Sequence, residues 1–483
     1  MPCTTILAGK AATNDGSTLI ARNDDGGFDT KKIIVVAPDK QPKKYKSVIS
    51  HLEIELPDDP LSYTACPNVS KKDGIWAACG INSAKVGMTA TETITSNPRV
   101  DGADPMVKYI PKEGKNGKEV PGGIGEEDLV VLVLPYIRSA REGVLRLGEL
   151  LEKYGTYENN GIAFNDENEV WWLETIGGHH WIACRVPDDR VVIMPNQFGL
   201  DHFDFEDALG EGKNYLCSKD LKEFTEKNGL DLQPGKPFNP RLAYGSHSDG
   251  DHIYNTPRAW YMARYFLPRA YKWDGPDADY TPESDDIPCS MVPERRVTVE
   301  DVKYLLSCYY QGTPYNPYDK NATLKGRYRV IGVPNSDISG ILQIRGGSKQ
   351  PLEWMSMGGS GFTACFPFYP CVGKLPAYIS ETKDEVDTGY MYWNSRLIAA
   401  LTDAHYFTGI MYDGRYQDAV MNGARAIIAE YDGKYAENPD EKLLEEANEK
   451  ILKLVRNESA KVLKQLLDNA GEHMKTRFHR GDN

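Results

Sequence analysis

The sequence predicts an α+β fold built on antiparallel sheets. Three features indicate this class: a β-hairpin at the N-terminus, a series of short strands across residues 161–196, and long amphipathic helical patterns near the C-terminus. Strands joined by short turns pair antiparallel, and such a sheet commonly buries one face against the protein core. We therefore expect antiparallel sheets with helices packed against them.

The N-terminal hairpin is predicted from the turn signal Asn14-Asp15-Gly16, which lies between two β-prone runs. Such a turn needs positive φ angles, which asparagine and glycine tolerate. The first strand carries Cys3, and the second ends in Arg22 and Asp25. Because a hairpin brings the start of its first strand beside the end of its second, a thiol, a guanidinium and a carboxylate should share one neighbourhood.

Cys3 has a chemical advantage if it becomes the first residue. A free α-amine has a pKa of roughly 7.7–8.0 and a thiol one of about 8.5, so the amine can serve as the base for its own side chain. This reading requires removal of Met1-Pro2 and nothing more, because an amide nitrogen is not a base. The alternative is that Cys3 is simply a small buried strand residue.

The chain continues with short strands expected at 33–37, 51–56, 74–82 and 86–93, followed by helices at 126–137 and 139–154. Ser139 and Glu142 form a capping box for the second helix, which Gly155 closes. Residues 161–196 then read as a meander of four strands. Asn82 and Asn196 each follow a strand end, where asparagine either forms a turn or donates to a developing oxyanion.

Residues 199–296 are less regular and rich in Asp, Pro and Gly. Pro257 opens a helix there, and Arg258 near its start opposes the helix dipole, which indicates either another role or a surface salt bridge. A helix is expected at 299–311, strands at 327–333, 338–344, 352–357 and 362–366, and helices at 384–431 and 439–478. His179 and His180 are strand neighbours that face opposite sides, so they suit neither a shared metal ion nor a catalytic role.

The composition excludes several classes of partner. The net charge is −14, from 70 acidic and 56 basic residues, which disfavours nucleic acid and anionic membrane surfaces. Charged residues interrupt the N-terminal apolar run, so we expect no signal peptide, and no apolar run approaches the roughly 18 residues of a spanning helix. The nine scattered cysteines fit a reducing cytoplasm. Cys365 and Cys371 have no histidine nearby, so we expect no metal site.

Several motifs occur together in a fixed order. They are Cys3-Thr4-Thr5, Asp15-Gly16-Ser17-Thr18, Ala21-Arg22-Asn23-Asp24-Asp25, Gly80-Ile81-Asn82, Glu169 to Glu174, Pro195-Asn196-Gln197-Phe198 and Asn255-Thr256-Pro257-Arg258. In this combination the chain resembles the C69 family of cysteine dipeptidases over nearly its full length. These are N-terminal nucleophile (Ntn) hydrolases, similar to bacterial dipeptidase A enzymes and related to secernins.

The resemblance implies a four-layer αββα sandwich, with two antiparallel sheets between helical layers. It also implies that Cys3 is the nucleophile and its freed amine the base, with Arg22 and Asp25 beside them. Asn82 and Asn196 match oxyanion and substrate-positioning asparagines, and Arg258 matches a site arginine. The implied substrates are dipeptides, hydrolysed through an acyl-thioester without a metal or cofactor.

For the domain organisation we expect Met1-Pro2 as a short propeptide and residues 3–483 as a single catalytic domain. An irregular insertion falls around 199–296 and a helical segment at 384–478. Two other functions stay open: a related amide hydrolase of the bile-salt or penicillin acylase type, and a non-catalytic, secernin-like interaction protein. The sequence does not give the oligomeric state, and a homo-oligomer is one option.

Overall fold

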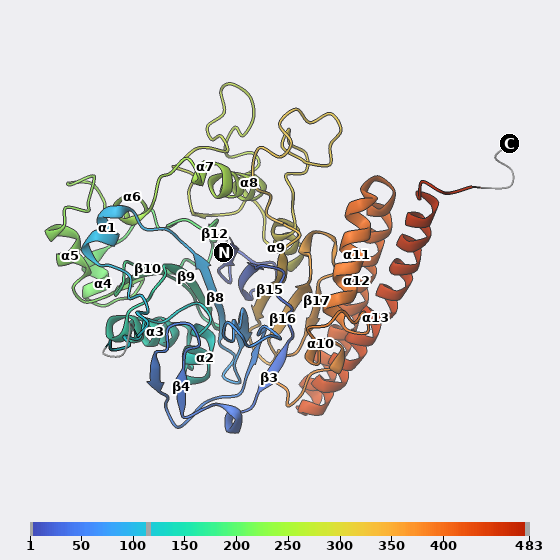
Figure 1. The fold of residues 1–483 in the computed structure, drawn as a ribbon, viewed down its shortest axis with the longest axis horizontal. Helices are drawn as coiled ribbons and strands as arrows, with labels where there is room; N and C mark the ends of the chain where they lie inside the picture. Colours follow the sequence, from blue (N-terminus) through green and yellow to red (C-terminus); the bar gives the residue numbers. More distant parts are fainter. Residues whose placement is uncertain (1–2, 113–116, 479–483) are drawn as a thin grey trace.

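The computed structural model describes residues 3–112 and 117–478, and its fold is α+β (Figure 1). Met1-Pro2, the expected propeptide, lies outside the described residues. Within them, two large antiparallel sheets face each other, one of seven strands in the order β14-β12-β1-β2-β15-β16-β17 and one of six in the order β13-β11-β10-β9-β8-β7. The remaining strands form two small two-stranded sheets, β3-β6 and β4-β5.

The seven-stranded sheet consists of β1 (Thr4–Ala8), β2 (Thr18–Asp25), β12 (Val191–Met194), β14 (Ser290–Met291), β15 (Ser336–Ile344), β16 (Leu352–Met357) and β17 (Phe366–Phe368). The six-stranded sheet consists of β7 (Cys79–Ile81), β8 (Gly87–Thr93), β9 (Asn160–Asn165), β10 (Val170–Ile176), β11 (His180–Val186) and β13 (Tyr215–Cys217). The small sheets are formed by β3 (Ile34–Val36), β4 (Lys44–Lys46), β5 (Glu53–Glu55) and β6 (Tyr63–Ala65).

The α-helices are α1 (Pro98–Ala103), α2 (Leu129–Val133), α3 (Ala140–Tyr154), α4 (Phe205–Leu209), α5 (Leu221–Lys227), α6 (Pro240–Tyr244), α7 (Asp251–Tyr254), α8 (Thr256–Phe266), α9 (Val299–Leu306), α10 (Ala377–Ser380), α11 (Met391–Ala404), α12 (Tyr406–Glu437) and α13 (Glu441–Glu472). Short 3₁₀ helices occur at η1 (Pro38–Lys40), η2 (Leu134–Tyr136) and η3 (Ser360–Phe362). No described helix combines the length and apolar character that a membrane crossing requires.

The elements form four layers. Helix α3 packs on β9, β10 and β11 of the six-stranded sheet, whereas α11, α12 and α13 pack against β16 and β17 of the seven-stranded sheet. The two sheets contact each other through β2 and β15 on one side and β8 and β9 on the other. Figure 1 shows α12 and α13, in orange and red, as a long antiparallel pair beside this sheet.

The N-terminal hairpin forms as predicted. Strands β1 and β2 pair antiparallel with Thr5 opposite Arg22, and Gly16 takes a φ of 77° in the turn. The Ser139 cap of α3 is also confirmed, because the Ser139 side chain accepts from the Glu142 N–H at 3.1 Å. The reciprocal bond of the expected capping box does not form, because the Glu142 carboxylate accepts the N–H of Arg138 instead. Turns and caps depend on contacts between residues a few positions apart, so the sequence predicts them without knowledge of the tertiary structure.

One strand of the predicted meander belongs to the other sheet. Strands β9, β10 and β11 pair in sequence, but β12 pairs with β1, with Met194 opposite Thr5. The turn before β12 is bound to the end of β1, since the N–H of Ala11 donates to the Asp188 carbonyl at 2.7 Å. This exchange brings the segment after Met194, including Asn196, to the Cys3 end of β1.

Other expectations for the chain also differ from the structure. The strand expected at 362–366 begins only at Phe366, as β17, and the helix expected at 384–431 is divided into α11 and α12. The described residues 327–333 form no strand, and the Arg329 N–H instead donates to the Ile253 carbonyl at 3.1 Å. The helix expected at 126–137 is limited to α2 and η2. Its acidic start is not a helical turn, because the three acidic side chains there are buried and engaged in other contacts.

Candidate active site

Cys3 and Arg22 lie in contact between the two sheets. Cys3 directly precedes β1 and shares a strand face with Thr5, while Arg22 lies opposite Thr5 on β2. The Arg22 side chain donates from Nη2 to the Cys3 sulfur at 3.1 Å and from Nη1 to the Ala78 carbonyl at 3.1 Å. Both side chains are buried. Among the charged groups around the thiol, Arg22 has the largest effect on its pKa.

Two carboxylates hold Arg22 in this position. Its Nη2 also contacts Asp24 Oδ1 at 2.8 Å and Glu126 Oε1 at 2.9 Å. Lys31 binds the other oxygen of Asp24 at 2.7 Å. Burial by itself would raise the pKa of Asp24, but Lys31 and Arg22 together lower it, so this carboxyl is ionised. Arg22 is therefore fixed as a charged group with little freedom to move.

The same atoms have the composition of a possible metal site. Ligand atoms of Cys3, Asp24 and Glu126 lie within 4.8 Å of one another. However, Nη2 of Arg22 donates to all three. A metal ion would have to displace this guanidinium, because both would occupy the centre of the same three acceptors. The donor set is therefore better matched to Arg22 than to a metal.

The Cys3 thiol is neutral in this environment. Burial raises its pKa to about 11, whereas the positive charge of Arg22 acts in the opposite direction. A thiol of this kind reacts as a nucleophile only when a nearby group accepts its proton.

Asp25 faces the side of β2 opposite to Arg22 and Asp24. Its carboxylate forms an ion pair with Arg329 and accepts from the Ser336 hydroxyl. Burial raises the pKa of Asp25 against the opposing effect of Arg329. The structure thus gives Asp25 a partner that the sequence did not indicate, in the segment 327–333 that was expected as a strand.

Arg258 is a buried hub that joins three separate segments. Its Nη1 donates to the Cys3 carbonyl and, at 2.6 Å, to the Thr4 hydroxyl. Its Nη2 donates to the Pro195 carbonyl at 2.9 Å and to Asn196 Oδ1 at 2.8 Å. A surface salt bridge is therefore excluded as its role, and Arg258 connects the backbone of the candidate nucleophile to Asn196.

Asn196 adopts a left-handed backbone conformation with φ of 63°, which asparagine tolerates better than most residues. Its side-chain amide donates to the Thr93 carbonyl at 2.9 Å and accepts from Arg258. Its backbone N–H donates to the carboxylate of Glu92. Asn196 is thus held between the two sheets at the Cys3 end of β1.

Asn82 makes contacts of a different kind from those of Asn196. Its amide donates to the carbonyls of Leu134 and Ile137, both at 2.8 Å, and its oxygen accepts from the N–H groups of Ala84 and Val86. Both amide hydrogens are therefore engaged with described residues. Asn82 also lies four strand positions beyond Ala78, or about 13 Å along β7. We assign it to the turn after β7 rather than to an oxyanion.

Sequence reasoning missed five charged residues at this site: Asp24, Lys31, Glu92, Glu126 and Arg329. Asp24 lies next to Asp25, which the sequence predicted for the site. Because side chains alternate along a strand, Asp24 lies on the same face as Arg22 and Asp25 does not. Glu126 begins the helix expected at 126–137, where an acidic residue is typical of a helix N-terminus. Glu92 is buried, and no other residue of β8 is charged. A single carboxylate in an otherwise uncharged strand was the sequence signal that could have indicated a functional group.

The adjacent histidines share one carboxylate elsewhere. Asp104 accepts Nδ1 contacts from His179 at 3.0 Å and from His180 at 2.7 Å. This arrangement ties β11 to the segment after α1. It involves none of the residues that surround Cys3.

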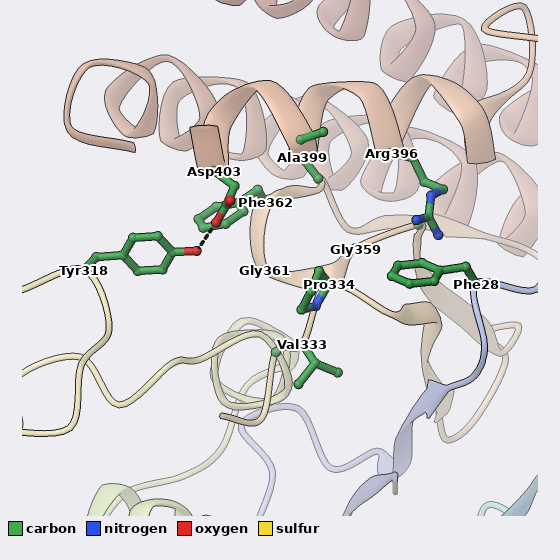
Figure 2. Close-up of a pocket in the computed structure, with 13 residues that line it drawn as sticks. Phe28, Tyr318, Val333, Pro334, Gly359, Gly361, Phe362, Arg396, Ala399 and Asp403 are labelled. Atoms are coloured by element: carbon green, nitrogen blue, oxygen red, sulfur yellow. Dashed lines mark hydrogen bonds between the residues drawn. The ribbon is translucent and has the colours of Figure 1, made fainter. Parts of the chain in front are cut away.

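A separate cavity of about 290 Å³ lies beside α11. Figure 2 shows Arg396 near Phe28 at one end and Asp403 bonded to Tyr318 at the other. The Arg396 guanidinium is 4.4 Å from the centre of the Phe28 ring. None of the six predicted site residues lines this cavity, so it is not part of the Cys3 cluster.

Comparisons with known proteins agree with the full-length resemblance. The model of peptidase family C69 matches residues 2–418. A dipeptidase of Bifidobacterium longum is 54% identical over 446 residues, which cover 90% of this chain and 84% of that protein. A probable dipeptidase A of Streptococcus pyogenes is 46% identical with full coverage of both chains. Dipeptidase A of Lactobacillus helveticus is 40% identical, with 96% of each chain covered.

Proposed function

The chain belongs to peptidase family C69 and is a dipeptidase, and from this premise we propose that the Cys3 thiol is its nucleophile. The single observation that carries the proposal is the contact of 3.1 Å between Arg22 Nη2 and the Cys3 sulfur. A fixed guanidinium stabilises a thiolate that forms beside it. The substrates are dipeptides, as the names of the relatives indicate for those proteins.

The base in this proposal is the α-amine of Cys3 after Met1-Pro2 has been removed. The amine takes the thiol proton, and the thiolate attacks the carbonyl carbon of the dipeptide to form a C–S bond. The C–N bond then breaks, and the departing amine takes the proton. Water hydrolyses the thioester, which releases the first amino acid and restores the thiol. Thiol, amine and amide groups supply every role, so no cofactor is required.

Asn196 and Arg258 have supporting roles in the proposal. Asn196 is held at the end of the nucleophile's strand and has a second amide hydrogen available to a developing oxyanion. Arg258 binds the Cys3 carbonyl and Asn196 together, so it keeps the nucleophile and the donor in register. Asp25 is the acceptor proposed for the freed amine, and Arg329 and Ser336 hold its carboxylate.

The first experiment is the intact mass and N-terminal sequence of the purified protein, beside a Cys3→Ala control, followed by turnover of dipeptides. We expect a mature chain that begins at Cys3. If the control retains Met1-Pro2, removal depends on the thiol itself. A fully active enzyme that still begins at Met1 would contradict the role of the amine. An unprocessed chain without activity would instead favour a secernin-like protein.

A further inference from the structure

A buried carboxylate that binds Asn196 has an oxygen without a partner among the described residues. Glu92, on β8, is completely buried, and its Oε2 makes no hydrogen bond with any described residue. Its other oxygen accepts the backbone N–H of Asn196. The hydroxyl of Thr5, which lies near this carboxyl on β1, likewise has no hydrogen-bond partner among the described residues.

The position of Glu92 relative to the nucleophile follows from the strands. Cys3 and Thr5 are two residues apart on one strand face, so their side chains are separated by about 6–7 Å. Glu92 reaches the same face from the opposite sheet, and the positive charges of Arg258 and Arg22 act on its carboxyl. The carboxylate therefore lies on the face of β1 that carries Cys3, next to Thr5.

An unpaired buried carboxyl is costly for a folded protein. Taking such a group out of water without a partner for each oxygen destabilises the fold. Leucine or methionine at this position would avoid that cost. Burial raises the pKa of Glu92 to about 7, against the hydrogen bond from the Asn196 N–H and the positive charge of Arg258. A cationic partner that entered the site would reverse this effect and satisfy the free oxygen.

A dipeptide has a cation at the required distance. Its α-ammonium is bonded to the carbon next to the scissile carbonyl, so it lies within about 6 Å of a sulfur positioned for attack on that carbonyl. We propose that Glu92 binds the α-ammonium group of the substrate and thereby makes the enzyme selective for peptides with a free N-terminus. This inference rests on the proposed dipeptidase function of the same site.

The test uses Ala-Ala and propionyl-alanine, which differ only by the α-amino group, and follows the release of alanine. In the wild-type enzyme we expect kcat/KM to be at least about 100-fold higher for Ala-Ala. Glu92→Gln keeps an oxygen for the Asn196 N–H but removes the charge. It should lower kcat/KM for Ala-Ala by a similar factor, mainly through KM, and leave the value for propionyl-alanine unchanged.

If propionyl-alanine is not turned over, its inhibition constant against Ala-Ala replaces kcat/KM as the readout. Glu353→Gln is the matched control. Glu353 lies on β16, is completely buried and also has one unpartnered oxygen, but it contacts Thr64 and not the Cys3 cluster. This variant should keep wild-type values for both compounds.

Three outcomes would overturn the inference, and they are distinguishable. Equal wild-type activity on both compounds would show that the α-amine is not recognised, while dipeptidase activity stands. An equal loss of kcat/KM for both compounds in Glu92→Gln would show that the carboxylate supports the enzyme's own structure or the α-amine of Cys3. A processed wild-type enzyme that hydrolyses no dipeptide would refute the proposed function itself.

Discussion

The Nη2 atom of Arg22 lies 3.1 Å from the sulfur of Cys3 and is held there by one carboxylate on its own strand and one on a distant segment. Asp24 is a near neighbour in sequence, whereas Glu126 is more than 100 residues away. Because both carboxylates are buried with Arg22, the guanidinium cannot turn toward solvent when the thiol loses its proton. The charge is thus in place before the reaction begins, as electrostatic stabilisation requires.

Arg22→Lys should lower kcat/KM for dipeptides by about 100-fold or more. A lysine ammonium lacks the planar fork that reaches the thiol, the Ala78 carbonyl and both carboxylates. The measurement is steady-state kinetics with the melting temperature determined in parallel. Arg345→Lys is the control, since Arg345 forms a largely buried pair with Asp432 away from Cys3. It should lower the melting temperature and leave kcat/KM unchanged; equal kinetic effects in both variants would refute a specific role for Arg22.

Cys3→Ala should abolish dipeptide hydrolysis, because no other group in the proposed scheme can form the thioester. Cys365→Ala removes another buried free thiol and should affect only stability. Hydrolysis is measured on both variants at the same protein concentration. Activity in Cys3→Ala comparable with that of Cys365→Ala would exclude Cys3 as the nucleophile.

Metal chelators should leave the activity unchanged. The three ligand atoms that could bind an ion already contact Arg22, so metal removal takes nothing from this cluster. The experiment is prolonged dialysis against a chelator, followed by dipeptide turnover with and without added zinc. A loss of activity that zinc restores would identify a metallopeptidase and contradict the cysteine mechanism.

Asn82→Ala should destabilise the protein without changing kcat at a temperature where the variant is folded. The substitution leaves the buried carbonyls of Leu134 and Ile137 without their donor, which costs on the order of 2–4 kcal/mol. Thermal unfolding and single-temperature kinetics separate the two effects. A fall in kcat of about 100-fold in the folded variant would restore the oxyanion role that the resemblance implies.

Glu353→Gln should stabilise the protein more at pH 8 than at pH 5. Burial raises the pKa of Glu353 to about 8, against the hydrogen bond of Thr64, whereas the unfolded chain releases this proton at about 4.3. Between these values the native state binds the extra proton, so its stability falls as pH rises, by up to about 1.4 kcal/mol per unit. Melting temperatures across this range provide the measurement, and a constant difference between variant and wild type would contradict the shift.

The sequence by itself determined the features that depend on neighbouring residues. Gly16 marks the turn that pairs β1 with β2, and Ser139 with Gly155 delimits α3, because turns and caps use bonds across a few positions. The order of motifs around Cys3 also sufficed to identify the family. Turns and caps carry their information within one short segment, and the order of the motifs is a property of the linear chain, so both can be read without knowledge of the fold.

Tertiary structure alone decided which residues meet. Strand β12 pairs with β1 and not with β11, which precedes it in sequence. This pairing brings Asn196 to the Cys3 end of β1. Glu126 joins Arg22, Arg329 joins Asp25, and Glu92 reaches Thr5, in each case across more than 80 residues or between two sheets. Such contacts depend on sheet order and on the burial of opposing faces, and neither residue of a pair carries a local signal for its distant partner.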